Sequence, residues 1–221
     1  MSFTYAPGCA LILHDQQSTL AMYKLVQKAL GQTDYSELCC FYKPNLLKGT
    51  EIINTCPGCD QRLKQLYEEF TTQTVWEILA AADHLELPVY DGMTLSIHDA
   101  CPTRERREVH EAVRKLAHKM KIKLIEPEHS GSSSICCGDS YYGVLSIDQV
   151  KQAMQNRADQ MPNDEVLVYC VSCVKAISIG GKKPRLLSDL LLGQETVPGV
   201  LDLDEWHKQL KEYRLEHFGP R

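Results

Sequence analysis

The sequence predicts an α/β protein made of two tandem, pseudo-symmetric repeats, each a short and largely parallel sheet flanked by helices, followed by a C-terminal helix. The ten cysteines form two sets with the same order, C…CC…CxxC, and no cysteine is left over. Short apolar segments rich in β-branched residues alternate with segments of helical periodicity, which is typical of parallel sheets. We expect cysteine-rich repeats over residues 1–95, the shorter one, and 96–200, and an amphipathic helix over 201–221.

Four segments are expected to be strands because they are short, apolar and end near a cysteine. The segments TEIINTCPGC and DEVLVYCVSC each end on a CxxC pair, and both are typical of buried strands. TLSIHDAC ends on Cys101, and SFTYAPGC is its counterpart before Cys9. Ligands of such sheets bind beyond the carboxyl ends of the strands. The first cysteine and the CxxC pair of each set should therefore converge on one site.

Helices are expected between these strands. One spans about residues 18–30, has Gly31 as its stop, and places four residues on one face: Leu20, Tyr23, Val26 and Leu30. A second spans about 104–121 after Thr103 as a cap, and its apolar stripe consists of Val109, Ala112, Val113, Leu116, Ala117 and Met120.

A third helix runs from about 147 to 161, opened by Ser146 and Gln149 in capping-box spacing. It has no partner in the first repeat, where only 15 residues separate Cys40 from Cys56, against 32 between Cys137 and Cys170. TTQTVWEILAAADHL carries a core-facing stripe of Val75, Ile78, Leu79 and Ala82. The C-terminal stripe suits packing against the chain's own domain or a partner subunit and consists of Leu203, Trp206, Leu210, Tyr213 and His217.

Composition and charge exclude several classes of protein. A net charge of −5 and a pI near 5.9 argue against a nucleic-acid-binding surface. The basic segment TRERREVHEAVRKLAHKMKIK is the exception, and is either the charged solvent face of a helix or a docking surface for an acidic partner. No apolar run approaches the roughly 20 residues of a membrane span, and no secretory signal is seen. We therefore expect a cytoplasmic protein with reduced thiols, which leaves metal or redox chemistry for the cysteines.

Five thiols per set fit some metal centres better than others. Structural zinc takes four ligands, usually from two CxxC-like pairs, so five cysteines with an adjacent doublet suit it poorly. A thioredoxin-type CxxC would leave the doublets without a role. The cubane ferredoxin spacing C-x2-C-x2-C-x3-C is absent. Soft thiolates in excess favour an iron–sulfur centre with more than four ligands.

The cysteine pattern resembles the CCG cysteine-rich domain of the heterodisulfide reductase B-subunit family over roughly residues 1–195. ICCGDSYYG matches the CCG signature, and DACPTRE and YCVSCVK lie where the family's first and last cysteines fall. The first set departs from the family in its short interval and in Phe41, which stands where the signature has glycine.

The resemblance implies two noncubane 4Fe-4S clusters, each on five cysteines, with a disulfide substrate split between them. Carried over by position, the first cluster would be held by Cys9, Cys39, Cys40, Cys56 and Cys59. The second would be held by Cys101, Cys136, Cys137, Cys170 and Cys173. Neighbouring thiolates could grip neighbouring iron atoms of one extended cluster.

The leading hypothesis is therefore a disulfide oxidoreductase subunit, because disulfide reduction needs two electrons and two one-electron clusters could each bind one sulfur. The alternatives are an electron-transfer subunit that serves a flavin- or quinone-linked partner, and a cluster-based redox sensor. The chain carries no ferredoxin motif and no GxGxxG. We expect electrons to come from a ferredoxin-like iron–sulfur subunit, with a flavoprotein subunit as a further partner.

A few residues near the cysteines are weaker candidates. His14 and His98 either donate a proton near a cluster or are hydrogen-bonded structural residues. Asp99 and Asp139 are expected to be loop or cap residues. The serine run 130–134 is expected to be a flexible loop, although its amides could bond to cluster sulfurs.

Overall fold

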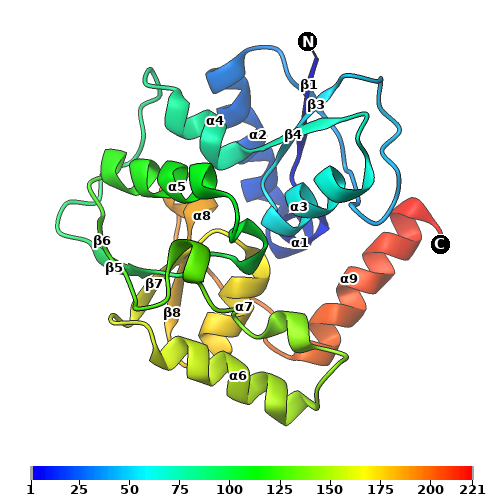
Figure 1. Ribbon diagram of the computed structural model, residues 1–221. Coiled ribbons are helices and arrows are strands. Elements are labelled where there is room, and N and C mark those ends of the chain that lie inside the picture. Colours follow the sequence, from blue (N-terminus) through cyan, green and yellow to red (C-terminus); the bar gives the residue numbers. More distant parts are fainter. Residues whose placement is uncertain (1, 221) are drawn as a thin grey trace. The chain divides into compact units, whose positions relative to one another are not determined.

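The computed structural model describes residues 2–220 and divides the chain into two compact units (Figure 1). The first unit runs to Glu86 and takes in the C-terminal stretch from His207, and the second is Leu87–Trp206. Each unit has a four-stranded, all-parallel sheet flanked by helices. The predicted fold class, with two similar halves and a C-terminal helix, is confirmed.

The first unit has the strand order β2-β1-β3-β4. Its strands are β1 (Phe3–Ala6), β2 (Asp34–Tyr35), β3 (Glu51–Asn54) and β4 (Thr71–Thr74). Its helices are α1 (Cys9–His14), α2 (Gln16–Leu30), α3 (Pro57–Leu66) and α4 (Val75–Ala81). Ile52 and Ile53 in β3 are fully buried, as expected of a central strand covered on both faces.

The second unit has the corresponding strand order, β6-β5-β7-β8. Its strands are β5 (Thr94–Ile97), β6 (Lys123–Ile125), β7 (Glu165–Val168) and β8 (Lys183–Leu186). Its helices are α5 (Arg107–Lys119), α6 (Ile147–Asp159), α7 (Val171–Ile179) and α8 (Leu187–Leu191). In both units the first and third strands are the central pair, so the two sheets repeat one topology.

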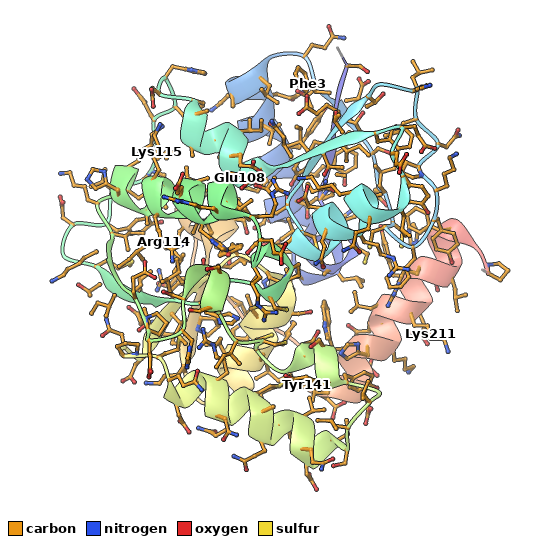
Figure 2. The ribbon with its side chains drawn as sticks, viewed as in Figure 1. Phe3, Glu108, Arg114, Lys115, Tyr141 and Lys211 are labelled. Atoms are coloured by element: carbon orange, nitrogen blue, oxygen red, sulfur yellow. The ribbon has the colours of Figure 1, made fainter. Side chains whose placement is uncertain are left out.

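The helices follow the sequence patterns closely. α6 begins with the expected capping box, because the Ser146 side chain accepts from the Gln149 backbone and the Gln149 side chain accepts from the Ser146 backbone. α5 buries the expected apolar stripe, while Glu108, Arg114 and Lys115 lie along its charged side (Figure 2). No helix lies between Cys40 and β3 in the first unit, which accounts for its short interval.

Two local expectations are corrected. Leu20 is 48% exposed, and α2 buries Ser18, Thr19 and Met22 besides the expected Val26. Thr103 does not cap α5, whose N-cap is Arg106, because Thr103 belongs to a separate 3₁₀ turn, Cys101–Thr103.

The C-terminal helix α9 (Leu203–Phe218) buries four of the five residues of the predicted stripe, with Leu203, Trp206, Leu210 and Tyr213 each at most 8% exposed, whereas His217 is exposed. Its packing is therefore onto this chain. Among residues 2–220, no helix combines the length and the apolar character that crossing a membrane requires.

Candidate metal centres

Three adjacent strands of the first sheet each lead into cysteines. β1 is followed by Cys9, β2 by the doublet Cys39–Cys40, and β3 by Cys56 and Cys59. The strands are parallel, so their carboxyl ends lie at one edge of the sheet. The topology thereby brings the five thiols of the first set to one place.

The second sheet repeats this arrangement. β5 is followed by Cys101, β6 by the doublet Cys136–Cys137, and β7 by Cys170 and Cys173. These three strands are again adjacent and parallel. In both sheets the fourth strand leads to no cysteine.

Each CxxC pair opens a helix. Cys56 is the N-cap of α3 and Cys170 the N-cap of α7, so Cys59 and Cys173 lie at the third helical position. Side chains three residues apart on a helix face the same side, which directs both thiols of a pair to one site. Backbone N–H groups at the start of α3 stabilise the thiolate of Cys56. Two backbone N–H groups, those of Gly58 and Cys59, donate to the Cys56 sulfur.

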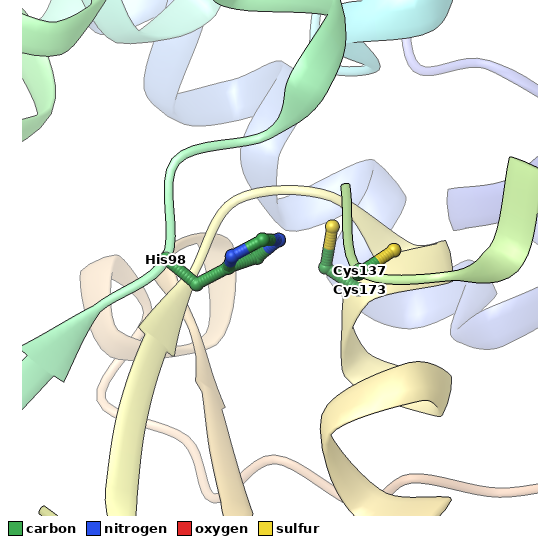
Figure 3. A group of neighbouring side chains, drawn as sticks. All are labelled: His98, Cys137 and Cys173. Carbon is green, nitrogen blue, oxygen red and sulfur yellow. The ribbon is translucent and has the colours of Figure 1, made fainter. Parts of the chain in front are cut away.

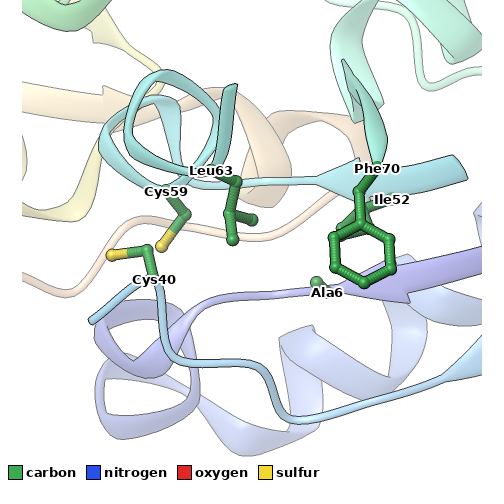
Figure 4. Packing of buried hydrophobic residues seen from close by; sticks show 6 residues of the cluster. All are labelled: Ala6, Cys40, Ile52, Cys59, Leu63 and Phe70. Atoms are coloured by element: carbon green, nitrogen blue, oxygen red, sulfur yellow. The ribbon is translucent and has the colours of Figure 1, made fainter. Parts of the chain in front are cut away.

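Thiols of the first set interact directly. The Cys59 thiol is a hydrogen-bond partner of both Cys40 and Cys56. Cys9 lies close enough to Cys39, Cys40 and Cys56 for their charges to raise its pKa. Figure 4 shows the sulfurs of Cys40 and Cys59 next to one another, at the end of a buried apolar cluster that includes Ala6, Ile52, Leu63 and Phe70.

The second set has matching contacts. The Cys101 and Cys136 Sγ atoms are 3.8 Å apart. The Cys173 thiol is a hydrogen-bond partner of Cys137 and Cys170. In both units, therefore, the second cysteine of the doublet meets the second cysteine of the CxxC pair.

The crowded thiols cannot all ionise without a cation. Burial, with repulsion from neighbouring thiolates, raises the pKa of Cys9 to about 12. Hydrogen bonding to Cys136, followed by burial, raises the pKa of Cys101. Hydrogen bonds from Cys59 lower the pKa of Cys56 to about 7, and those from Cys101 and Cys137 lower that of Cys136. A cationic iron centre would remove this conflict, so the donor set fits a polynuclear thiolate-bound group.

The glycine of the CCG signature, Gly138, is required by its backbone conformation and by its close contact with α6. Gly138 has φ +108°, and a Cβ on it would lie 2.9 Å from Met154 Cγ and 3.0 Å from the Met154 backbone nitrogen. Its own N–H donates to Cys136 Sγ at 3.4 Å. No helix corresponding to α6 lies between Cys40 and β3 in the first unit. Phe41, the residue after the first doublet, therefore has room for a large side chain.

Phe41 instead packs against the guanidinium groups of two arginines beside the first set. Its ring lies 4.3 Å from the Arg62 guanidinium and 4.7 Å from that of Arg214. The pKa of Cys40 is lowered chiefly by its hydrogen bond with Cys59, and the charges of Arg62 and Arg214 lower it further. Sequence patterns missed both arginines; only the position of Arg62, one turn beyond Cys59, offered a hint.

His98 follows β5 and is fully buried beside the second set. One of its ring nitrogens lies within 4.8 Å of the sulfurs of Cys137 and Cys173 (Figure 3). Arg157 Nε donates to His98 Nδ1 at 3.1 Å, and burial together with the Arg157 charge lowers the pKa of His98 to about 3. His14, the other histidine singled out by sequence, is the last residue of α1. A proton-donating role for either remains a prediction.

Asp99 is a loop residue, as expected, and its buried carboxylate also braces the turn before Cys101. It accepts from Arg114 at 2.8 and 3.1 Å, from the Gly131 N–H at 2.7 Å and from the Tyr169 hydroxyl at 3.0 Å. Tyr169 also accepts from the Ala100 N–H at 3.1 Å. Asp139, by contrast, simply starts the 3₁₀ turn after Gly138.

The serine run has local structure around a short turn. It contains the 3₁₀ turn Gly131–Ser133. Ser134 is buried, its hydroxyl donates to the Asp99 carbonyl at 2.7 Å, and its own carbonyl accepts from Arg104.

Comparison with known families supports this description of the second unit. The model of the CCG cysteine-rich domain matches residues 95–178, a range that includes all five cysteines of the second set. No curated protein matches the chain. The domain match and the clustered thiols together indicate an iron–sulfur-binding, cysteine-rich domain of the kind found in iron–sulfur oxidoreductases.

Proposed function

We propose that this chain is an iron–sulfur redox subunit that reduces a disulfide, with two noncubane 4Fe-4S clusters. One would be held by Cys9, Cys39, Cys40, Cys56 and Cys59. The other would be held by Cys101, Cys136, Cys137, Cys170 and Cys173. The proposal extends the CCG resemblance from the matched second unit to the first.

The observation that carries this proposal is the repeated thiol arrangement. Each unit brings together five free thiols from three adjacent strand ends. In both units the corresponding pair of thiols is hydrogen-bonded, Cys40 with Cys59 and Cys137 with Cys173. Four thiols complete a zinc site or an ordinary cubane cluster. A fifth thiol in both units therefore favours a larger, open cluster.

The residues around the thiols favour binding of an iron–sulfur cluster. The helix N-terminus at Cys56 favours the ionised sulfur, and every cysteine of the two sets is buried or partly buried. A bound cluster would supply single electrons and iron sites for sulfur. A disulfide, RSSR, takes up two electrons and two protons to give two RSH, so two one-electron centres match the stoichiometry of the reaction.

Iron loading tests the cofactor. After anaerobic reconstitution we expect about eight iron and eight sulfide per chain, since two four-iron clusters require them. Cys137→Ser should remove or convert the second cluster and leave the first, and Cys40→Ser should do the reverse. Stoichiometric zinc with little iron, or cubane-type spectra at both sites, would refute the assignment.

Disulfide reduction tests the activity. A low-potential artificial donor should drive reduction of small disulfides by the loaded chain, and substitutions in either cysteine set should abolish it. A ferredoxin-like iron–sulfur subunit, with a flavoprotein behind it, is the proposed natural source of electrons. A fully loaded chain that reduces no disulfide, yet exchanges electrons quickly with such a subunit, would instead be a relay.

A further inference from the structure

The second unit has a buried histidine before its first cysteine, at a position where the first unit has none. β5 is followed by His98 and Asp99, whereas β1 is followed by Pro7 and Gly8. His98 is 0% exposed, and its Nε2 atom has no hydrogen-bond partner among residues 2–220. A buried donor without a partner costs about 1–3 kcal/mol, so a fold retains one where something else binds it.

The hydrogen bond on the other side of the ring fixes its tautomer. A guanidinium has only donors, so His98 Nδ1, which faces Arg157 Nε at 3.1 Å, must be an unprotonated acceptor. The neutral ring then carries its proton on Nε2.

Arg157 cannot easily turn away. Its other nitrogens donate to Gln160 Oε1 at 2.8 Å and to the His129 carbonyl at 2.9 Å, and it is 1% exposed. This orientation of the imidazole is thus built into the fold.

The free N–H points at the thiols. Figure 3 shows the ring nitrogen that lies farther from the backbone directed toward Cys137 and Cys173. A metal ion bound by His98, Cys137 and Cys173 would need the Nε2 lone pair, and would force the proton onto Nδ1 against the Arg157 donor. That arrangement sets two donors against each other, so the geometry argues against His98 as a ligand.

We propose that His98 is a positioning residue that donates its Nε2–H to a sulfur of the metal centre in the second unit, with Arg157 holding the donor tautomer. The inference rests on the proposed function for the identity of that centre. Hydrogen bonds to cluster sulfurs raise the reduction potential, because they stabilise the more negative, reduced state. His98 would therefore make the second centre easier to reduce than its thiols alone would.

Nitrogen NMR of the metal-free protein tests the tautomer directly. Long-range ¹H–¹⁵N correlations should show His98 protonated on Nε2 and unprotonated on Nδ1, with the signal assigned by its loss in His98→Leu. A proton on Nδ1 would overturn this inference and leave the proposed function untouched.

Reduction potentials of the loaded protein test the role. In His98→Leu the ratio of reduced to oxidised second centre, at a fixed applied potential, should fall about tenfold, equivalent to about 59 mV for one electron. His98→Gln can both accept from Arg157 and donate to sulfur, so it should recover most of the shift. His118→Gln, at an exposed position of α5, is the matched control and should change nothing.

Iron content separates a donor from a ligand. His98→Leu should keep its full iron content, whereas Cys137→Ser should not. Loss of iron from His98→Leu and His98→Gln alike, or an unchanged potential in His98→Leu, would overturn the donor role. Failure of the wild-type chain to take up iron would overturn the proposed function and this role with it, even with the Nε2–H tautomer confirmed.

Discussion

The glycine of the CCG signature should be indispensable to the stability of the second unit. Gly138→Ala places a Cβ 3.0 Å from the Met154 backbone nitrogen, which belongs to α6 and cannot move as a side-chain tip can. The positive φ costs a non-glycine residue about 1–2 kcal/mol, and overpacking a filled site adds typically about 1–3 kcal/mol. The free energy of unfolding should therefore fall by about 2–5 kcal/mol.

Denaturant unfolding of the metal-free protein measures this loss. Gly143→Ala is the matched control, because Gly143 has φ +77° but nothing within 4 Å of its would-be Cβ. The control should lose only the backbone contribution, about 1–2 kcal/mol. Equal losses in the two variants would show that contact with α6 does not explain the glycine.

Three further predictions concern the surroundings of the cysteine sets. Phe41→Leu removes two cation–π contacts and should lower the free energy of unfolding by about 1–2 kcal/mol, whereas Phe41→Tyr keeps the ring and should lose little; equal losses would contradict the stacking argument. Tyr169→Phe leaves the buried Ala100 N–H without its acceptor and should cost about 1–3 kcal/mol, so an unchanged denaturation midpoint would rule out this bond as a brace. Burial lowers the pKa of His110, so the unfolded chain binds the proton more readily and stability should fall as pH drops below about 6.5; His110→Gln should weaken that dependence, and identical pH profiles would exclude His110 as its source.

The strands and helices that carry strong local patterns could be predicted from sequence. β3 and β7 are β-branched runs that lead into a CxxC pair, and the capping-box residues Ser146 and Gln149 predict the start of α6. β4 could not be predicted in the same way, because its sequence is TTQT. Its buried Thr72 is satisfied by Asp60 of α3, at 2.6 Å between the side-chain oxygens, a tertiary contact that no local pattern reveals.

The same distinction applies to the candidate sites. Strand ends and cysteine spacing are local features, and they were sufficient to predict which cysteines would gather. The groups that set the charge and the hydrogen bonding around the thiols come from distant parts of the chain. Arg157 of α6 orients His98, and Arg214 of α9 reaches Phe41, so each pairing depends on helix packing rather than on a nearby sequence signal.

These distant groups make two copies of one scaffold chemically unequal. The first set has the formal charges of Arg62 and Arg214 beside it, held by a phenylalanine in the place of the CCG glycine. The second set has a neutral imidazole whose N–H is aimed at the thiols, with Arg157 behind it. A nearby cation and a single hydrogen-bond dipole stabilise added negative charge to different degrees, and solvent screens the partly exposed arginines more than the buried histidine. Two identical thiol sets would accept electrons at the same potential, whereas under the proposed function these different surroundings would make the two centres accept their electrons at different potentials.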